Sequence, residues 1–136
     1  MQKVIKSLFL VQIGLFILTL LFLFTPVGEM FLPGGFILLA IFSLLGLVFT
    51  FFVRKHLKKS KLKKILVING LSSFGLLFFS VLHNLMYALG EVINIEILGK
   101  VIGFIGGAFF ITGVVVSPVV FLITTITSII YFRKKL

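Results

Sequence analysis

The stretch SVLHNLMYALGE, from Ser80 to Glu91, places a histidine, an asparagine and a tyrosine inside an otherwise apolar segment. An imidazole can carry a proton or bind a metal, and an amide or a phenol can hydrogen-bond a polar solute. If such a segment crosses a membrane, polar and ionisable groups in it are unfavourable in lipid. Their presence there makes them candidates for a functional role. His83, Asn84 and Tyr87 are therefore the first candidates for a site.

These groups belong to a polar stripe on one predicted helix. At about 100° per residue, its polar side chains fall within an arc of about 120°, and the opposite face is apolar. Polar groups in a membrane face protein or water, so the stripe either hydrogen-bonds neighbouring helices or lines a binding or conducting site. We favour the first interpretation. The candidate residues are Asn69, Ser73, Ser80, His83, Asn84 and Tyr87.

Other kinds of chemistry lack the residues that they require. His83 is the single histidine within a predicted span, His56 lies in a basic connection, and the chain has no cysteine. A metal site needs several ligands, and a catalytic triad needs an acid partner for its histidine. The acids all lie outside the span cores. We therefore expect no metal, no cofactor and no enzymatic activity.

The composition predicts a membrane protein. Hydrophobic residues make up 60% of the 136 residues, charged residues make up 12%, and the mean hydropathy is +1.34. A soluble domain of this length could not bury so much apolar surface. Four apolar runs, at about residues 4–24, 36–53, 65–89 and 101–132, are each long enough to cross a bilayer. The sequence thus predicts a single all-α domain, a four-helix transmembrane bundle. A signal peptide is a less favoured interpretation of the first run.

The net charge of +10 is distributed as a topology signal rather than as a nucleic-acid patch. All but one of the 13 basic residues precede the first run, separate the second from the third, or end the chain; Lys100 and the three acids lie at the other junctions. Lys and Arg favour the cytoplasmic side. Both termini are therefore predicted inside, in the cytoplasmic membrane. The connection could also bind anionic lipid headgroups, through Arg54, Lys55, Lys58, Lys59, Lys61, Lys63 and Lys64.

The fourth run carries a stripe of small residues, which lets helix backbones approach closely. We favour packing within one bundle over a dimer interface. Pro118 leaves the carbonyl of Val114 free and predicts a kink. His83 and Asn84 are expected to face this stripe and to bond near the proline. The packing residues are Gly103, Gly107, Gly113, Ser117 and Pro118.

The second half of the chain resembles a family of small four-helix prokaryotic membrane proteins. The resemblance lies in a Leu-His-Asn motif with a following tyrosine, in a proline within the fourth helix, and in a basic C-terminus. It implies a fold and a topology but no activity. The matching residues are Leu82, His83, Asn84, Tyr87 and Pro118.

The role expected from the sequence is that of a structural or accessory subunit in the bilayer, with a homo-oligomer or a larger membrane complex left open. The alternative is a small-solute or ion transporter or channel that uses the polar stripe. A water-accessible cavity reaching His83 would favour transport, whereas a dry bundle with an apolar flank would favour the accessory role.

The predicted topology can be tested directly because the chain has no cysteine of its own. A cysteine introduced at Ser60 should react in intact cells only with membrane-permeant thiol reagents. A cysteine at Glu29 should react with impermeant reagents, because the positive-inside rule places it on the opposite side. The reverse labelling pattern would refute the orientation.

Overall fold

The computed structural model describes residues 2–26 and 32–134, so Glu29 and Lys135 lie outside the described residues. The regular structure in these ranges is helical, and four helical segments are long and apolar enough to cross a membrane. This confirms the predicted all-helical fold with four long apolar helices. The elements are α1 (Gln2–Phe24), α3 (Leu32–His56), α4 (Lys61–Val92), α5 (Glu96–Ile111), the π-helical turn η1 (Thr112–Val116) and α6 (Ser117–Lys134).

The second half of the chain is more helical than predicted. α4 extends to Val92, α5 begins at Glu96, and only residues 93–95 connect them. The apolar runs at 65–89 and 101–132 instead predict a longer outer connection between the two helices. Apolar residues on both sides of Asn94 allow the helices to continue into that stretch.

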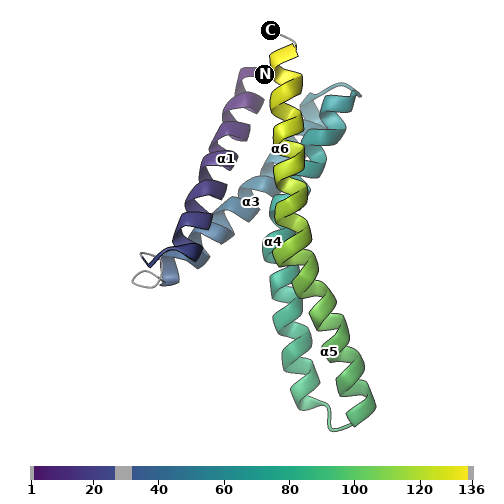
Figure 1. Cartoon of the computed structure of the whole chain (residues 1–136). Coiled ribbons are helices and arrows are strands. Elements are labelled where there is room, and N and C mark those ends of the chain that lie inside the picture. The colour runs from purple at the N-terminus through teal and green to yellow at the C-terminus, as the bar shows by residue number, and fades with distance from the viewer. Residues whose placement is uncertain (1, 27–31, 135–136) are drawn as a thin grey trace.

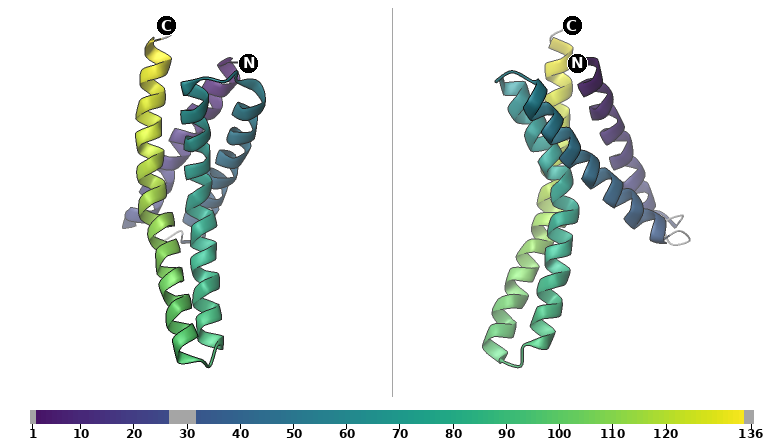
Figure 2. Two further views of the ribbon diagram at one scale, coloured as in Figure 1. Left: turned by 90° about the vertical axis from the view of Figure 1, so that its right-hand side faces the viewer. Right: turned by 180° about the vertical axis from the view of Figure 1, so that it is seen from behind.

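The helices form two arms that diverge from a shared end. The start of α1, the α3–α4 connection and the end of α6 lie at this end (Figure 1). Seen from behind, α1 and α3 lean to one side while α4 and α5 extend to the other (Figure 2). We call the paired helices α4 from Leu76 onward and α5 the α4–α5 arm.

Two glycines hold α3 against α4 where these helices cross. A Cβ added at Gly70 would lie 2.6 Å from the carbonyl oxygen of Gly46, and one added at Gly46 would lie 2.7 Å from that of Gly70. Only a residue without a side chain allows two helix backbones to come this close. Thr50, which bonds to the Gly46 carbonyl at 2.9 Å, lies one turn further along α3.

Phenylalanines from three helices form two clusters on either side of this crossing level. Phe16, Phe42 and Phe121 pack with ring centroids 4.7 to 5.5 Å apart on the side towards the α4–α5 arm. Phe9 packs on Phe49 and on Phe132 at 6.3 and 5.7 Å on the side of the termini. We call these the arm-side and the termini-side phenylalanine clusters. Their rings bury the large apolar surface that such side chains contribute to a core.

The last span bends by a change of helix type next to Pro118. A proline has no N–H, and its ring disturbs the carbonyl one turn earlier. The backbone widens into η1, where the Ser117 N–H bonds to the Thr112 carbonyl, and the Ser117 hydroxyl donates to the same oxygen at 2.9 Å. The predicted irregularity at Pro118 is thus a π-turn that precedes the proline, a common cause of a bend.

We expect Gly70→Ala to destabilise the protein by about 1–3 kcal/mol, because the added methyl would overpack the α3–α4 crossing. Gly14→Ala is the matched control, because a Cβ there meets nothing within 4 Å. The measurement is the free energy of unfolding in mixed micelles as the fraction of dodecyl sulfate rises. Equal stability of the two variants would show that the crossing is looser than the structure indicates.

Candidate functional site

Asn69 joins α4 to α6 at the centre of the molecule. Its fully buried amide nitrogen donates to the carbonyl oxygen of Phe121 at 3.2 Å and to the hydroxyls of Thr124 and Thr125 at 3.0 and 2.9 Å. Hydrogen bonds between membrane helices contribute about 0.6 kcal/mol each on average. This one side chain therefore fastens two helices together.

Gln12, which is not among the site residues predicted from the sequence, joins α1 to α4 at the same level. Its fully buried side-chain amide donates to the hydroxyl of Ser73, which itself donates to the Gly70 carbonyl at 2.8 Å. Its position in the middle of an apolar run could have identified it from the sequence, because a polar group in lipid needs a partner. We call Gln12, Asn69, Ser73, Thr124 and Thr125 the polar layer.

The two phenylalanine clusters enclose the polar layer along the bundle. Gln12 lies between Phe9 and Phe16 in α1, and the two threonines lie between Phe121 and Phe132 in α6. Several buried oxygens at or near this level have no hydrogen-bond partner among the described residues. They are Gln12 Oε1, Ser43 Oγ, Asn69 Oδ1 and Ser128 Oγ. Such groups are accommodated by water where space permits.

The predicted stripe on α4 is divided by the structure. Asn69 and Ser73 are fully buried in the polar layer, whereas Ser80 bonds to the Leu76 carbonyl of its own helix at 2.6 Å. His83 is half-buried against α5. The stripe therefore does not form one continuous site.

His83 packs against α5. Its Nδ1 lies 2.9 Å from the carbonyl oxygen of Gly106, and its ring centroid lies 5.2 Å from that of Phe110. A carbonyl can only accept a hydrogen bond, so Nδ1 carries a proton and donates it to Gly106. The absence of a side chain on Gly106 lets the imidazole approach the backbone.

The expected inward position of Asn84 was wrong, and Tyr87 does not pack within the bundle either. Both side chains are exposed, and Tyr87 retains 63% of its surface. They lie one and four positions after His83 in α4. At these positions the side chains point away from the narrow contact between α4 and α5. Only two helices pack in the α4–α5 arm, so a polar arc as wide as about 120° cannot be covered there.

The expected hydrogen-bond acceptor near Pro118 was also wrong. α4 and the last span run antiparallel from a short connection, so residues further along α4 face residues earlier in α5. Gly75 faces the Ser117 hydroxyl, and a Cβ there would lie 2.8 Å from it. His83, two turns further on, accordingly meets Gly106.

The small-residue stripe packs in part only. Gly113 and Ser117 are buried against α4, and a Cβ at Gly113 would lie 3.1 Å from that of Phe79. Gly103 and Gly107 do not pack as expected, because a Cβ at either would meet nothing within 4 Å. The contact is made by Gly106, which lies on the side of α5 facing Met86 and His83.

The basic residues of the α3–α4 connection differ in role. The Lys63 ammonium donates to the carbonyl oxygens of Arg54 and Leu57 at 2.7 and 2.6 Å, so it closes the turn between the helices. Ser60 caps α4 by accepting from the Lys63 N–H. Exposed side chains are those of Arg54, Lys55, Lys58, Lys59, Lys61 and Lys64.

Residues 2–26 and 32–134 contain no group of three or more His, Asp or Glu side chains that could hold a metal ion. Two hollows described in these ranges lie at the end that carries the termini, and neither is lined by His83. The described arrangement around His83 can support packing between helices, but it gathers no set of groups for catalysis.

Comparison with protein-family models, curated proteins and solved structures finds no match. The resemblance to small four-helix prokaryotic membrane proteins therefore stays a prediction that rests on the residues quoted above.

We expect His83→Leu to lower the free energy of unfolding in micelles by about 1 kcal/mol, the net value of one hydrogen bond. His83→Lys should cost more, because it places an ammonium beside the apolar arm without an acid to pair with. Asn84→Leu is the neighbouring control and should be close to neutral, since its side chain is exposed. A loss for Asn84→Leu as large as for His83→Leu would contradict this account.

Proposed function

We propose that the chain is a multi-pass protein of the cytoplasmic membrane, with both termini inside, and that it serves as a structural or accessory subunit. Four apolar helices support the membrane location, and the distribution of basic residues supports the orientation. The observation that carries the role is the uncovered α4–α5 arm.

Helix α4, whose second half belongs to the arm, is longer than a bilayer crossing requires. α4 has 32 residues, which corresponds to about 48 Å of helix, whereas the hydrocarbon core is about 30 Å thick. A tilt of about 40°, the upper end of the usual range, still leaves about 37 Å of its length along the membrane normal. Part of the arm therefore extends past the lipid tails if the basic end stays at the opposite surface.

The end of the arm nonetheless exposes large apolar side chains beside its charged ones. Val92, Ile97 and Phe104 retain 78%, 76% and 80% of their surface. From Leu76 to Val92 no residue of α4 is buried, and in α5 only Gly106 is buried. Exposed apolar surface of this kind, beyond what lipid can cover, is typical of a surface that another protein covers.

A second copy of the chain is the occupant we propose for this surface. Gly103 and Gly107 form a Gly-xxx-Gly pair on the open side of α5, where an added Cβ meets nothing within 4 Å. Gly-xxx-Gly pairs allow two identical helices to cross closely. The exposed Phe110 and Val114 continue the same face of the span.

Transport through the polar stripe has less support. A conducting path would need polar groups in sequence across the membrane, but the arm-side phenylalanine cluster lies between the polar layer and His83. Ser80 bonds within its own helix, and Asn84 and Tyr87 face outward. Catalysis likewise has no assembled set of groups to support it.

We expect the purified chain to be dimeric in mild detergent and Gly107→Leu to weaken dimerisation at least about tenfold, because the larger side chain separates the crossing helices. Mass spectrometry of the intact complex, together with light scattering, measures the subunit number. Dimer strength should be compared over a dilution series in detergent.

The control variant is Ala108→Leu, which introduces the same leucine side chain at an exposed position adjacent to Gly107 but turned away from the glycine pair. It should leave the dimer intact. A monomeric wild-type chain would refute the self-association. Stoichiometric co-purification of a different membrane protein, lost with Gly107→Leu, would keep the accessory role but replace the second copy as the occupant.

A further inference from the structure

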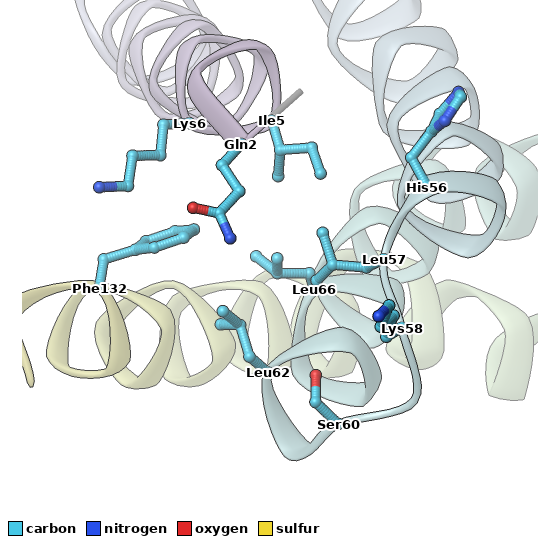
Figure 3. A pocket seen from close by; sticks show the side chains of 10 residues that line it. All are labelled: Gln2, Ile5, Lys6, His56, Leu57, Lys58, Ser60, Leu62, Leu66 and Phe132. Carbon is cyan, nitrogen blue, oxygen red and sulfur yellow. The ribbon is translucent and has the colours of Figure 1, made fainter. Parts of the chain in front are cut away.

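We propose that the hollow at the end of the termini binds the phosphate headgroup of an anionic lipid. The hollow has a volume of about 500 Å³ and lies between the start of α1, the α3–α4 connection and the end of α6 (Figure 3). It is large enough for a phosphate with a small alcohol and the first carbons of an acyl chain.

The lining of the hollow is amphipathic. Its cationic side chains are those of Lys6 and Lys58. His56 lies at its edge, with the ring turned away from the centre (Figure 3). Gln2 points into the hollow, and its amide adds donors. A phosphate is recognised by such cations and donors. The apolar part of the lining is formed by Ile5, Leu57, Leu62, Leu66 and Phe132.

No carboxylate among the described residues neutralises this end. Glu91 lies near the far end of α4. Glu96 forms an ion pair with Lys100 at 2.7 Å in the α4–α5 arm. The cations around the hollow can attract an anion, and the inner surface of a membrane offers anionic headgroups.

A second hollow offers room for an acyl chain. Its volume is about 180 Å³, and it shares Lys6 and Phe132 with the first. From there it continues along α1 and α6 past Phe9, Leu10 and Ile129. The Lys6 ammonium lies 5.4 Å from the centre of the Phe132 ring at this junction. An amphipathic hollow next to an apolar groove fits a lipid better than a free phosphate ion.

This site differs from a diffuse attraction to the basic connection. Lys63 is committed to the turn, and Lys55 and Lys64 are exposed without lining the hollow. Lys6 lies near the start of the chain and Lys58 in the α3–α4 connection, and only the fold places them on opposite sides of one hollow (Figure 3). Binding should therefore depend on particular lysines and not on total charge alone.

The test compares full-length variants in mild detergent with phosphatidylglycerol, phosphatidylcholine or inorganic phosphate, read by mass spectrometry of the intact protein. Wild type should retain phosphatidylglycerol in preference to phosphatidylcholine. The double variant Lys6→Gln with Lys58→Gln should bind phosphatidylglycerol about thirtyfold more weakly, equivalent to about 2 kcal/mol. Lys55→Gln with Lys64→Gln removes the same charge outside the hollow and should retain binding.

A second variant separates the lipid from the ion. Ile129→Trp fills the apolar groove and should weaken the binding of phosphatidylglycerol, although every lysine remains in place. Equal losses in both lysine pairs, or no loss in either, would refute the discrete site. Displacement of phosphatidylglycerol by equimolar inorganic phosphate would assign the hollow to a free anion and refute the lipid.

The inference rests on the proposed membrane location but not on the proposed dimer. Gly107 lies in the α4–α5 arm, away from the hollow, so the two experiments fail independently. Loss of selective lipid binding with a persistent dimer would refute the headgroup site alone. A monomeric chain that retains phosphatidylglycerol would refute the second copy alone.

Discussion

The close contact between α3 and α4 at Gly46 and Gly70 is the constraint on which the rest of the structure depends. Because the two backbones nearly touch, Ser73 and Asn69 on α4 are held within the bundle, where they reach Gln12 on α1 and the threonines of α6. In lipid the hydrophobic effect does not drive helices together, so close packing and hydrogen bonds decide which helices associate. The glycines provide the approach, and the polar layer fixes which faces meet.

The same crossing explains why the molecule is uneven along its length. The buried core, with both phenylalanine clusters, lies in the half that contains the termini. Beyond the crossing α1 and α3 lean away, and α4 retains only α5 as a neighbour (Figure 2). A pair of helices cannot bury all of its large side chains, so the α4–α5 arm leaves many apolar side chains exposed.

The sequence predicted the helical class and the four apolar segments well, because long apolar runs and charge distribution are strong signals. It predicted individual contacts less well. The position of His83 opposite the glycines of α5 was accessible from the pattern, but Asn84 was assigned to the interior on angle alone. A helical wheel gives the direction of each side chain. It does not give the width of the arc that neighbouring helices cover, because that width depends on how many neighbours the helix has.

Two of the differences between the predicted and the observed contacts could have been anticipated from the sequence. The antiparallel pairing of α4 with α5 and α6 follows from their short connection, and it places His83 far from Pro118. Gln12 was visible as a polar residue in an apolar run. The choice of Gly106 over Gly103 and Gly107 was not visible, because adjacent glycines on one helix differ only in their angle about the helix axis.

The polar layer also bears on how the molecule could move. Gln12 and Asn69 each leave a side-chain oxygen without a partner among the described residues, at a level where phenylalanines close both sides. Sliding α1 along α4 would break the Gln12–Ser73 hydrogen bond and would also displace rings from both clusters. Since interdigitated rings resist small shifts, the half of the bundle near the termini should behave as one rigid unit. The arm, with few buried side chains and a π-turn at its base, is then the part of the chain that can adapt to whatever packs against it.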